Sequence, residues 1–188
     1  MRGLVVIAVL AGISLLCGCS SSLDQDQYVA FVNDTKNRLH VIEHFKEFVF
    51  DVQYQPADYL KLKSTRQDAE NPNPEWQYYV LNIGVRGATT DIERYLSTSD
   101  AELQRHRYHF SFHFQNDLSL EQEGVALPCL LFHAEQSLKS GHFKTFVLAF
   151  ENKFPESKES KLVIKSDLFD SLPLKIKISK TTPVLRKL

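Results

Sequence analysis

The chain has 188 residues, with 22 basic and 23 acidic side chains, so its formal net charge at neutral pH is only −1. The chain has no excess of the basic residues with which nucleic-acid-binding domains neutralise phosphates, so no nucleic-acid partner is expected. The three cysteines are too few for a disulfide framework, and the length suits one sizeable hydrophobic core.

The amino-terminal segment has the pattern of an export signal. Arg2 supplies one positive charge, and an apolar run from Leu4 to Leu16 follows it. This run is shorter than the roughly 20 apolar residues that a membrane-spanning helix needs. A cationic start followed by a short apolar segment is typical of a secretory signal. A buried core helix would show a polar face, which this run lacks.

The apolar run ends in Leu16-Cys17-Gly18-Cys19, which resembles the lipobox of bacterial lipoproteins. Leu16 stands three places before Cys19 and the small residue Gly18 stands directly before it, whereas Cys17 inside the box departs from the usual pattern. The resemblance implies that residues 1–18 are a signal peptide and that Cys19 carries diacylglycerol and usually a third acyl chain, such as palmitate. Two or more buried acyl chains hold a protein firmly at a membrane.

The same resemblance implies a location in the cell envelope. Ser20 follows the modified cysteine, and a residue other than aspartate there accompanies outer-membrane sorting in lipoproteins of this type, which favours the outer over the inner membrane. Residues 19–27 are small and polar and predict a flexible lipidated tether. Residues 28–188 are expected to form a single domain in which Cys129 is the only free thiol of the processed chain.

This domain is expected to be mainly β. Apolar residues alternate with others over 48–54, and 76–85 is rich in aromatic and β-branched residues. Residues 107–114 place an aromatic at every second position and are predicted to be the cleanest strand. Turn signals separate the other predicted strands, which are 118–121, 126–133, 143–150, 162–165 and 174–179.

Short helices are expected at only a few places. Pro56 begins a helical turn over 56–62, Thr90 caps a helix over 90–96, and Ser99 with Glu102 has capping-box spacing. Two prolines between residues 67 and 75 indicate a loop. Many short strands with little helix predict an antiparallel β-sandwich that resembles the immunoglobulin-like folds, with an open barrel as the alternative.

The sharpest candidate for chemistry is the histidine set His106, His109 and His113. On a helix these residues would share one face, as metal ligands do. In the predicted strand, however, His109 and His113 would lie about 13 Å apart at roughly 3.3 Å per residue, too far for one ion to bind both. We therefore predict solvated histidines and no metal or cofactor, unless neighbouring strands complete a site.

No catalytic residue is predicted, although an enzyme is not excluded. Cys129 and His133 lie four residues apart on a predicted strand, too far for direct proton transfer, and apolar neighbours favour a packed thiol. Two carboxylate pairs carry no sign of a cleft: Glu121 with Glu123, and Asp167 with Asp170. The sequence also lacks a glycine-rich phosphate loop and a nucleophile elbow.

Two surface features suggest binding. Trp76, Tyr78 and Tyr79 follow the proline loop and are a candidate binding patch for protein or glycan, although a tryptophan that opens a strand also suits core packing. A row of lysines lies along the last predicted strand, either guarding a sheet edge or contacting anionic head groups. These lysines are Lys175, Lys177 and Lys180.

The sequence favours a lipid-anchored envelope lipoprotein that acts as a binding or structural interaction module. Its expected partners are the membrane, through the acyl chains, and an envelope protein or glycan. Two alternatives remain from the residues alone. One is an envelope hydrolase whose histidines and carboxylates are assembled by the fold, and the other is a carrier of lipids or other hydrophobic molecules with a cavity lined by aromatic side chains.

Overall fold

The structure is a computed structural model that describes residues 22–64, 72–135 and 142–186. The expected signal peptide, the lipobox and the acylated Cys19 all lie outside these residues, as does most of the expected loop at 67–75. None of the described helices is long and apolar enough to cross a membrane.

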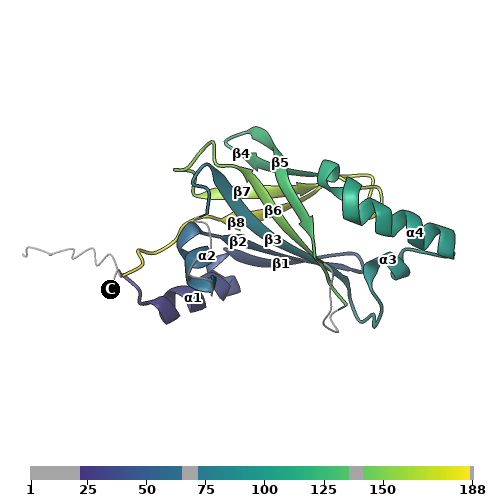
Figure 1. The fold of residues 1–188 in the computed structure, drawn as a ribbon, viewed down its shortest axis with the longest axis horizontal. Helices are drawn as coiled ribbons and strands as arrows, with labels where there is room; N and C mark the ends of the chain where they lie inside the picture. Colours follow the sequence, from purple (N-terminus) through teal and green to yellow (C-terminus); the bar gives the residue numbers. More distant parts are fainter. Residues whose placement is uncertain (1–21, 65–71, 136–141, 187–188) are drawn as a thin grey trace, which may run out of the picture.

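Eight antiparallel strands form one sheet that nearly closes on itself (Figure 1). The order across the sheet is β1-β2-β3-β6-β5-β4-β7-β8. The strands are β1 (His40–Phe45), β2 (Phe48–Gln55), β3 (Trp76–Val85), β4 (Leu118–Gln122), β5 (Val125–Ala134), β6 (Lys144–Glu151), β7 (Glu159–Ile164) and β8 (Leu174–Ser179).

The sheet closes only partly at the seam between its end strands, β1 and β8. At one end of the seam the backbone amide of Ser179 donates to the carbonyl of Arg38 at 2.8 Å. Further along, the ring of Phe169 packs against Phe48 and Phe50, with centroids 5.1 and 5.0 Å apart, so a loop covers the inner face where the strands do not pair. The mainly antiparallel β expectation is confirmed, but the strands form one barrel-like sheet instead of two separately ordered ones.

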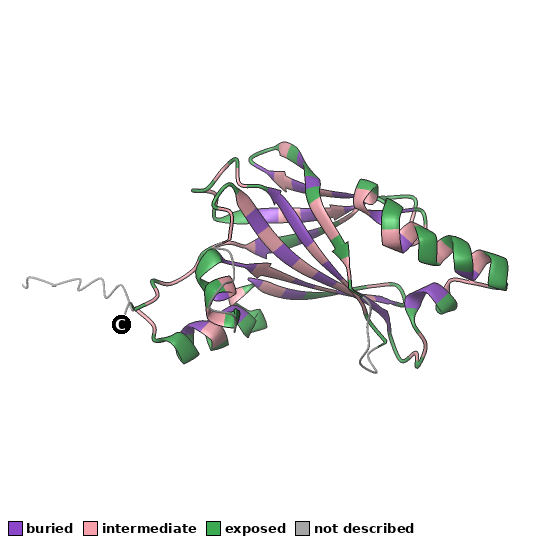
Figure 2. Cartoon of the chain, viewed as in Figure 1, coloured by how far each residue is buried: buried purple, intermediate pink, exposed green. Residues whose placement is uncertain are grey.

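The interior of the sheet holds a cluster of aromatic rings packed among aliphatic side chains. Alternate residues of each strand point inward, as the two-residue period of a strand requires. Phe110, Phe114 and Phe146 are fully buried, and their neighbouring ring centroids lie between 5.1 and 6.1 Å apart. Figure 2 shows the resulting alternation of buried and less buried residues along the strands.

Helical segments cover the two ends of the sheet (Figure 1). At the end we call the α1–α2 end lie α1 (Gln25–Asn33), the 3-10 turn η1 (Thr35–Asn37) and α2 (Ala57–Lys63), over a second small core. At the other end, the α4 end, lie α3 (Ile92–Tyr95), α4 (Asp100–Tyr108), the π-helical turn η2 (His109–His113) and the 3-10 turn η3 (Phe114–Asp117).

The structure corrects one strand prediction outright. Residues 107–114 are helical, because Phe110 and Phe114 are spaced four apart and both insert into the core from one side of the helix. The aromatic residues at every second position therefore lie on two sides of a helical turn: Phe110 and Phe114 are buried, and Tyr108 and Phe112 are exposed. His106, His109 and His113 accordingly lie on a helical segment and not on an extended strand.

Smaller differences concern element boundaries. Residues 25–27, expected in the tether, open α1, where Asp24 and Gln27 form a capping box. The cap of α3 is Asp91 in place of Thr90, and Pro56 is the cap of α2 in place of its first residue. Strand β1 was not predicted, because its apolar residues Val41, Ile42 and Phe45 do not alternate with polar residues.

Candidate functional site

Exposed aromatic rings define a surface on the α4 end, which we call the α4 surface: Tyr108, Phe112 and His113. Tyr108 is 58% exposed and Phe112 is 66% exposed. The ring of Tyr108 lies 5.1 Å from the rings of both Phe112 and His113, so the three rings form one contiguous cluster. Exposed apolar clusters of this kind mark interaction sites more often than isolated apolar residues do.

The local sequence explains why these rings face outward. Ser99 caps α4, and the helix continues into the π-helical turn of residues 109–113. A π turn inserts an additional residue into the helical register, and such turns occur preferentially at functional sites. Phe110 and Phe114 then point into the core, which leaves Tyr108 and Phe112 on the solvent side.

A hollow of about 480 Å³ lies beside the α4 surface and contains a histidine–carboxylate pair. His109 Nε2 lies 3.1 Å from Asp117 Oδ2. Residues that share this hollow are Arg105, His106, Lys165, Ser166, Asp167 and Leu168. A carboxylate that orients an imidazole is one half of a general-base arrangement, although among the described residues no hydrogen bond joins His109 to Ser166.

The histidines singled out by the sequence do not assemble into a metal site. His106 Nδ1 bonds to the hydroxyl of Ser97 at 2.9 Å, while His109 bonds to Asp117 and His113 packs on Tyr108. Across residues 22–64, 72–135 and 142–186, no group of three or more histidine, cysteine or acidic side chains is arranged to hold an ion.

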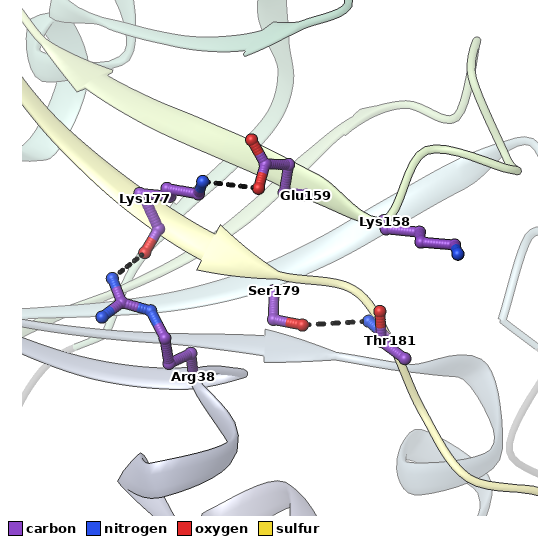
Figure 3. A pocket seen from close by; sticks show the side chains of 6 residues that line it. All are labelled: Arg38, Lys158, Glu159, Lys177, Ser179 and Thr181. Carbon is purple, nitrogen blue, oxygen red and sulfur yellow. Dashed lines mark hydrogen bonds and ion pairs between the residues drawn. The ribbon is translucent and has the colours of Figure 1, made fainter.

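A second hollow of about 560 Å³ lies at the seam, near the α1–α2 end (Figure 3). We call it the seam groove, and it is lined by Arg38, Lys158, Glu159, Lys177, Ser179 and Thr181. Lys177 Nζ forms an ion pair with Glu159 Oε2 at 2.6 Å. The guanidinium of Arg38 donates to the backbone carbonyl of Lys177 at 3.4 Å, a bond that leaves most of its donors free.

The seam groove is electropositive. Three of its side chains are cationic and one is anionic, so the lining carries a net charge of about +2. Within the described part of the chain, neither Arg38 nor Lys158 forms an ion pair with a carboxylate. Sequence inspection missed both residues because each lies among other polar and charged residues, and 120 positions separate the two.

The predicted patch of Trp76, Tyr78 and Tyr79 is not one surface. Consecutive residues of β3 face opposite sides of the sheet, so Tyr79 is buried while Trp76 and Tyr78 pack together on the outer side with centroids 6.2 Å apart. The hydroxyl of Tyr79 bonds to Ser160 and Gln77, and burial raises the pKa of Tyr79 above its ordinary range.

The row of lysines on β8 is largely paired with carboxylates. Glu121 accepts from Lys175 at 2.7 Å and from Lys161 at 2.9 Å, and these two bonds lower the pKa of Glu121 to about 2. Lys180 lies over the ring of Tyr54, and burial lowers the pKa of Lys180 to about 8. Because β8 is an end strand of the sheet, this charged row occupies an edge, as one of the two interpretations expected.

The remaining candidates lie apart. Cys129 is 7% exposed, its thiol donates to the carbonyl of Leu131 at 3.1 Å, and burial raises the pKa of Cys129 to about 12. His133 is exposed on the same strand, and Glu123 sits at an exposed turn next to Glu121. Asp170 forms an ion pair with Lys46, while Asp167 is exposed beside the hollow at His109.

Comparisons with known proteins return no match, whether to a family model, to a curated protein or to a solved structure. Function is therefore argued from the residues and their geometry.

Proposed function

We propose that this protein is a cell-envelope lipoprotein, anchored through acyl chains on Cys19, that acts as a binding or structural interaction module. The lipobox resemblance of Leu16-Cys17-Gly18-Cys19 supports the anchor, and Ser20 favours the outer membrane. The partner is an envelope protein or glycan that docks on the α4 surface. The proposal rests on the highly exposed rings of Tyr108 and Phe112, which lie at the α4 end, opposite the α1–α2 end.

In this proposal the anchored side is the α1–α2 end of the domain. The backbone amide of Leu23 donates to the carbonyl of Val184 at 2.9 Å, and the amide of Arg186 donates to the carbonyl of Leu23 at 2.8 Å. Leu23 thus fixes the entry of the chain at the α1–α2 end. Cys19 precedes Leu23 by four residues, which span at most about 14 Å when extended. Acyl chains on Cys19 would therefore hold the α1–α2 end close to the bilayer.

In this proposal the docking surface lies at the other end of the domain. Figure 1 shows α4 at the opposite end of the long axis of the molecule from α1. A domain held by its α1–α2 end would present Tyr108 and Phe112 away from the bilayer. Large, rigid aromatic side chains are the residues that most often dominate binding energy at interfaces.

The proposal is tested by recovering the protein from membranes of its host under mild extraction. Wild type is compared with the double variant Tyr108→Ala and Phe112→Ala, and with Leu172→Ala as a control, since Leu172 is 74% exposed but lies outside the α4 surface. We expect one specific partner to copurify with wild type and control and to be lost from the double variant. Recovery that is indifferent to the double substitution would contradict the proposal.

The anchor is tested separately by mass spectrometry of the mature amino terminus. We expect a chain that begins at Cys19 with diacylglycerol on its sulfur. A Cys19→Ala variant is expected to remain unprocessed, so that its amino terminus keeps residues 1–18 and carries no diacylglycerol. An unmodified Cys19 thiol in protein purified from the host would remove the basis for the membrane geometry.

One observation favours a second function. His109 and Asp117 form an oriented histidine–carboxylate pair that opens onto a hollow shared with Ser166, as the hydrolase alternative requires. Hydrolysis of a chromogenic ester that is lost in His109→Gln but retained in His133→Gln would support that function. The carrier alternative gains no such support, since the inner rings of Phe110, Phe114 and Phe146 contact one another.

A further inference from the structure

We propose that the seam groove is a binding site for a phosphate group, carried by a lipid head group or by a soluble phosphate ester. This site is separate from the α4 surface, and the proposal does not depend on the partner that docks there. It rests on how Arg38 and Lys158 are held, on their lack of carboxylate partners, and on the hydroxyl groups between them.

The two cations are fixed on opposite sides of the end of β8. The amide of Ser179 donates to the carbonyl of Arg38, and the amide of Lys180 donates to the carbonyl of Lys158, each at 2.8 Å. Consecutive amides of an extended segment point in opposite directions, so these bonds place the two residues on either side of the strand end. Arg38 also adopts a positive φ of 60°, which is uncommon for a residue with a side chain.

Their side chains are available to a ligand. In the described part of the chain, no carboxylate lies within ion-pair distance of Arg38 or Lys158. The single carboxylate of the groove, that of Glu159, is already paired with Lys177 at 2.6 Å. This pairing limits the repulsion that Glu159 would exert on an incoming anion, and it leaves two uncompensated positive charges at the groove.

Hydroxyl groups complete the donor set. Ser179 Oγ accepts a hydrogen bond from the amide of Thr181 at 3.2 Å, so its own hydrogen remains free to donate. Thr181 lines the same hollow and offers a second hydroxyl. Figure 3 shows Ser179 and Thr181 at the strand end, with Arg38 on one side and Lys158 on the other.

In Figure 3 the side chains of Arg38 and Lys158 extend away from each other, so a bound ligand would have to draw both toward Ser179 and Thr181. With both drawn in, the combination fits phosphate better than other ligand classes. An arginine fork, a lysine charge and hydroxyl donors are the groups that satisfy tetrahedral phosphate oxygens. A neutral ligand would leave both cations uncompensated. A carboxylate has two oxygen atoms and a single negative charge, so it offers fewer acceptors and less charge to this donor set than the three terminal oxygens of a phosphate monoester do. The volume of about 560 Å³ accommodates a head group rather than an isolated ion.

The experiment uses the full-length protein in neutral maltoside micelles at low salt and measures binding by calorimetry. One probe is glycerol phosphate, with glycerol as its uncharged control. The other is phosphatidylglycerol added to the micelles, with phosphatidylcholine as its control. The groove variant carries Arg38→Gln and Lys158→Gln. The matched control carries Arg107→Gln and Lys63→Gln, which remove one arginine charge and one lysine charge at exposed positions outside the seam groove.

We expect wild type to bind at least one phosphate probe, and the groove variant to bind it at least about tenfold more weakly, whereas the control changes affinity by less than about twofold. Binding of glycerol phosphate identifies a soluble ester as a sufficient ligand, and binding of the phospholipid alone identifies the membrane as the source. The proposal is overturned if neither probe binds wild type, or if the two double variants lose affinity equally. Neither outcome bears on partner recovery through the α4 surface.

Discussion

Lys144 in β6 and Glu93 in α3 form an ion pair of 2.8 Å that is largely withdrawn from water, with the two side chains 18% and 6% exposed. This pair ties the short helix α3 to the first residue of the central strand β6. Because α3 leads into α4, the pair also helps to fix the start of the helical segment that carries the α4 surface.

Removing one partner of this ion pair should be costly. We expect Lys144→Ala to lower the free energy of unfolding by about 3 kcal/mol, because it leaves the carboxylate of Glu93 buried without its cation. The combined change Lys144→Met and Glu93→Leu should recover most of that loss, since neither charge remains buried. Urea denaturation of wild type and of these two variants measures the difference. Equal losses for the single and combined changes would show that packing and not the unpaired charge dominates.

The ring of Phe169 should contribute strongly to the stability of the fold, because it fills the part of the seam where β1 and β8 do not pair. It is buried against Phe48 and Phe50, so Phe169→Ala should lower the free energy of unfolding by about 3–5 kcal/mol. Phe112→Ala removes the same atoms from an exposed site and should change the free energy of unfolding by no more than about 0.5 kcal/mol. Urea denaturation compares the two, and the second result also shows whether an α4 surface variant remains folded.

The carboxylate of Glu121 should make the stability of the fold depend on pH. Its pKa falls from 4.5 to about 2 in the folded protein because Lys175 and Lys161 donate to it. A lowered folded-state pKa stabilises the fold fully above pH 4.5, and this contribution is lost as pH falls toward 2. The urea midpoint of Glu121→Gln should therefore lie below that of wild type at pH 7 and approach it in acid. A gap that is independent of pH would contradict this assignment.

The thiol of Cys129 should be inert in the folded protein. Burial raises its pKa to about 12, so almost no thiolate is present at pH 8. We expect a thiol reagent to label this cysteine at least about a hundredfold more slowly in buffer than in denaturing urea, because only the thiolate reacts. Cys129→Ala provides the blank for any other thiol in the chain. Rapid labelling of the folded protein would mean that the site opens frequently.

Local sequence was enough to predict most strands. Alternation of apolar residues predicted β2, and aromatic and β-branched content predicted β3; both are strands within one residue of the expected bounds. The segment at residues 107–114 shows where this signal fails. Its aromatics are spaced by two and also by four, so the local pattern is compatible with either period. The burial of Phe110 and Phe114 against Phe146 decides in favour of the helix.

The candidate sites depended still more on tertiary structure. Arg38 and Lys158 are distant in sequence and meet only because two backbone bonds hold them beside the end of β8. His109 and Asp117 meet because η2 and η3 turn the chain back within eight residues. Sequence by itself determined the β-rich character of this protein, its packed thiol and the resemblance at Cys19, because these follow from residues close together in the chain. Closure of the sheet, exposure of Tyr108 and Phe112, and the charge of the seam groove were decided by long-range packing, which no local pattern encodes.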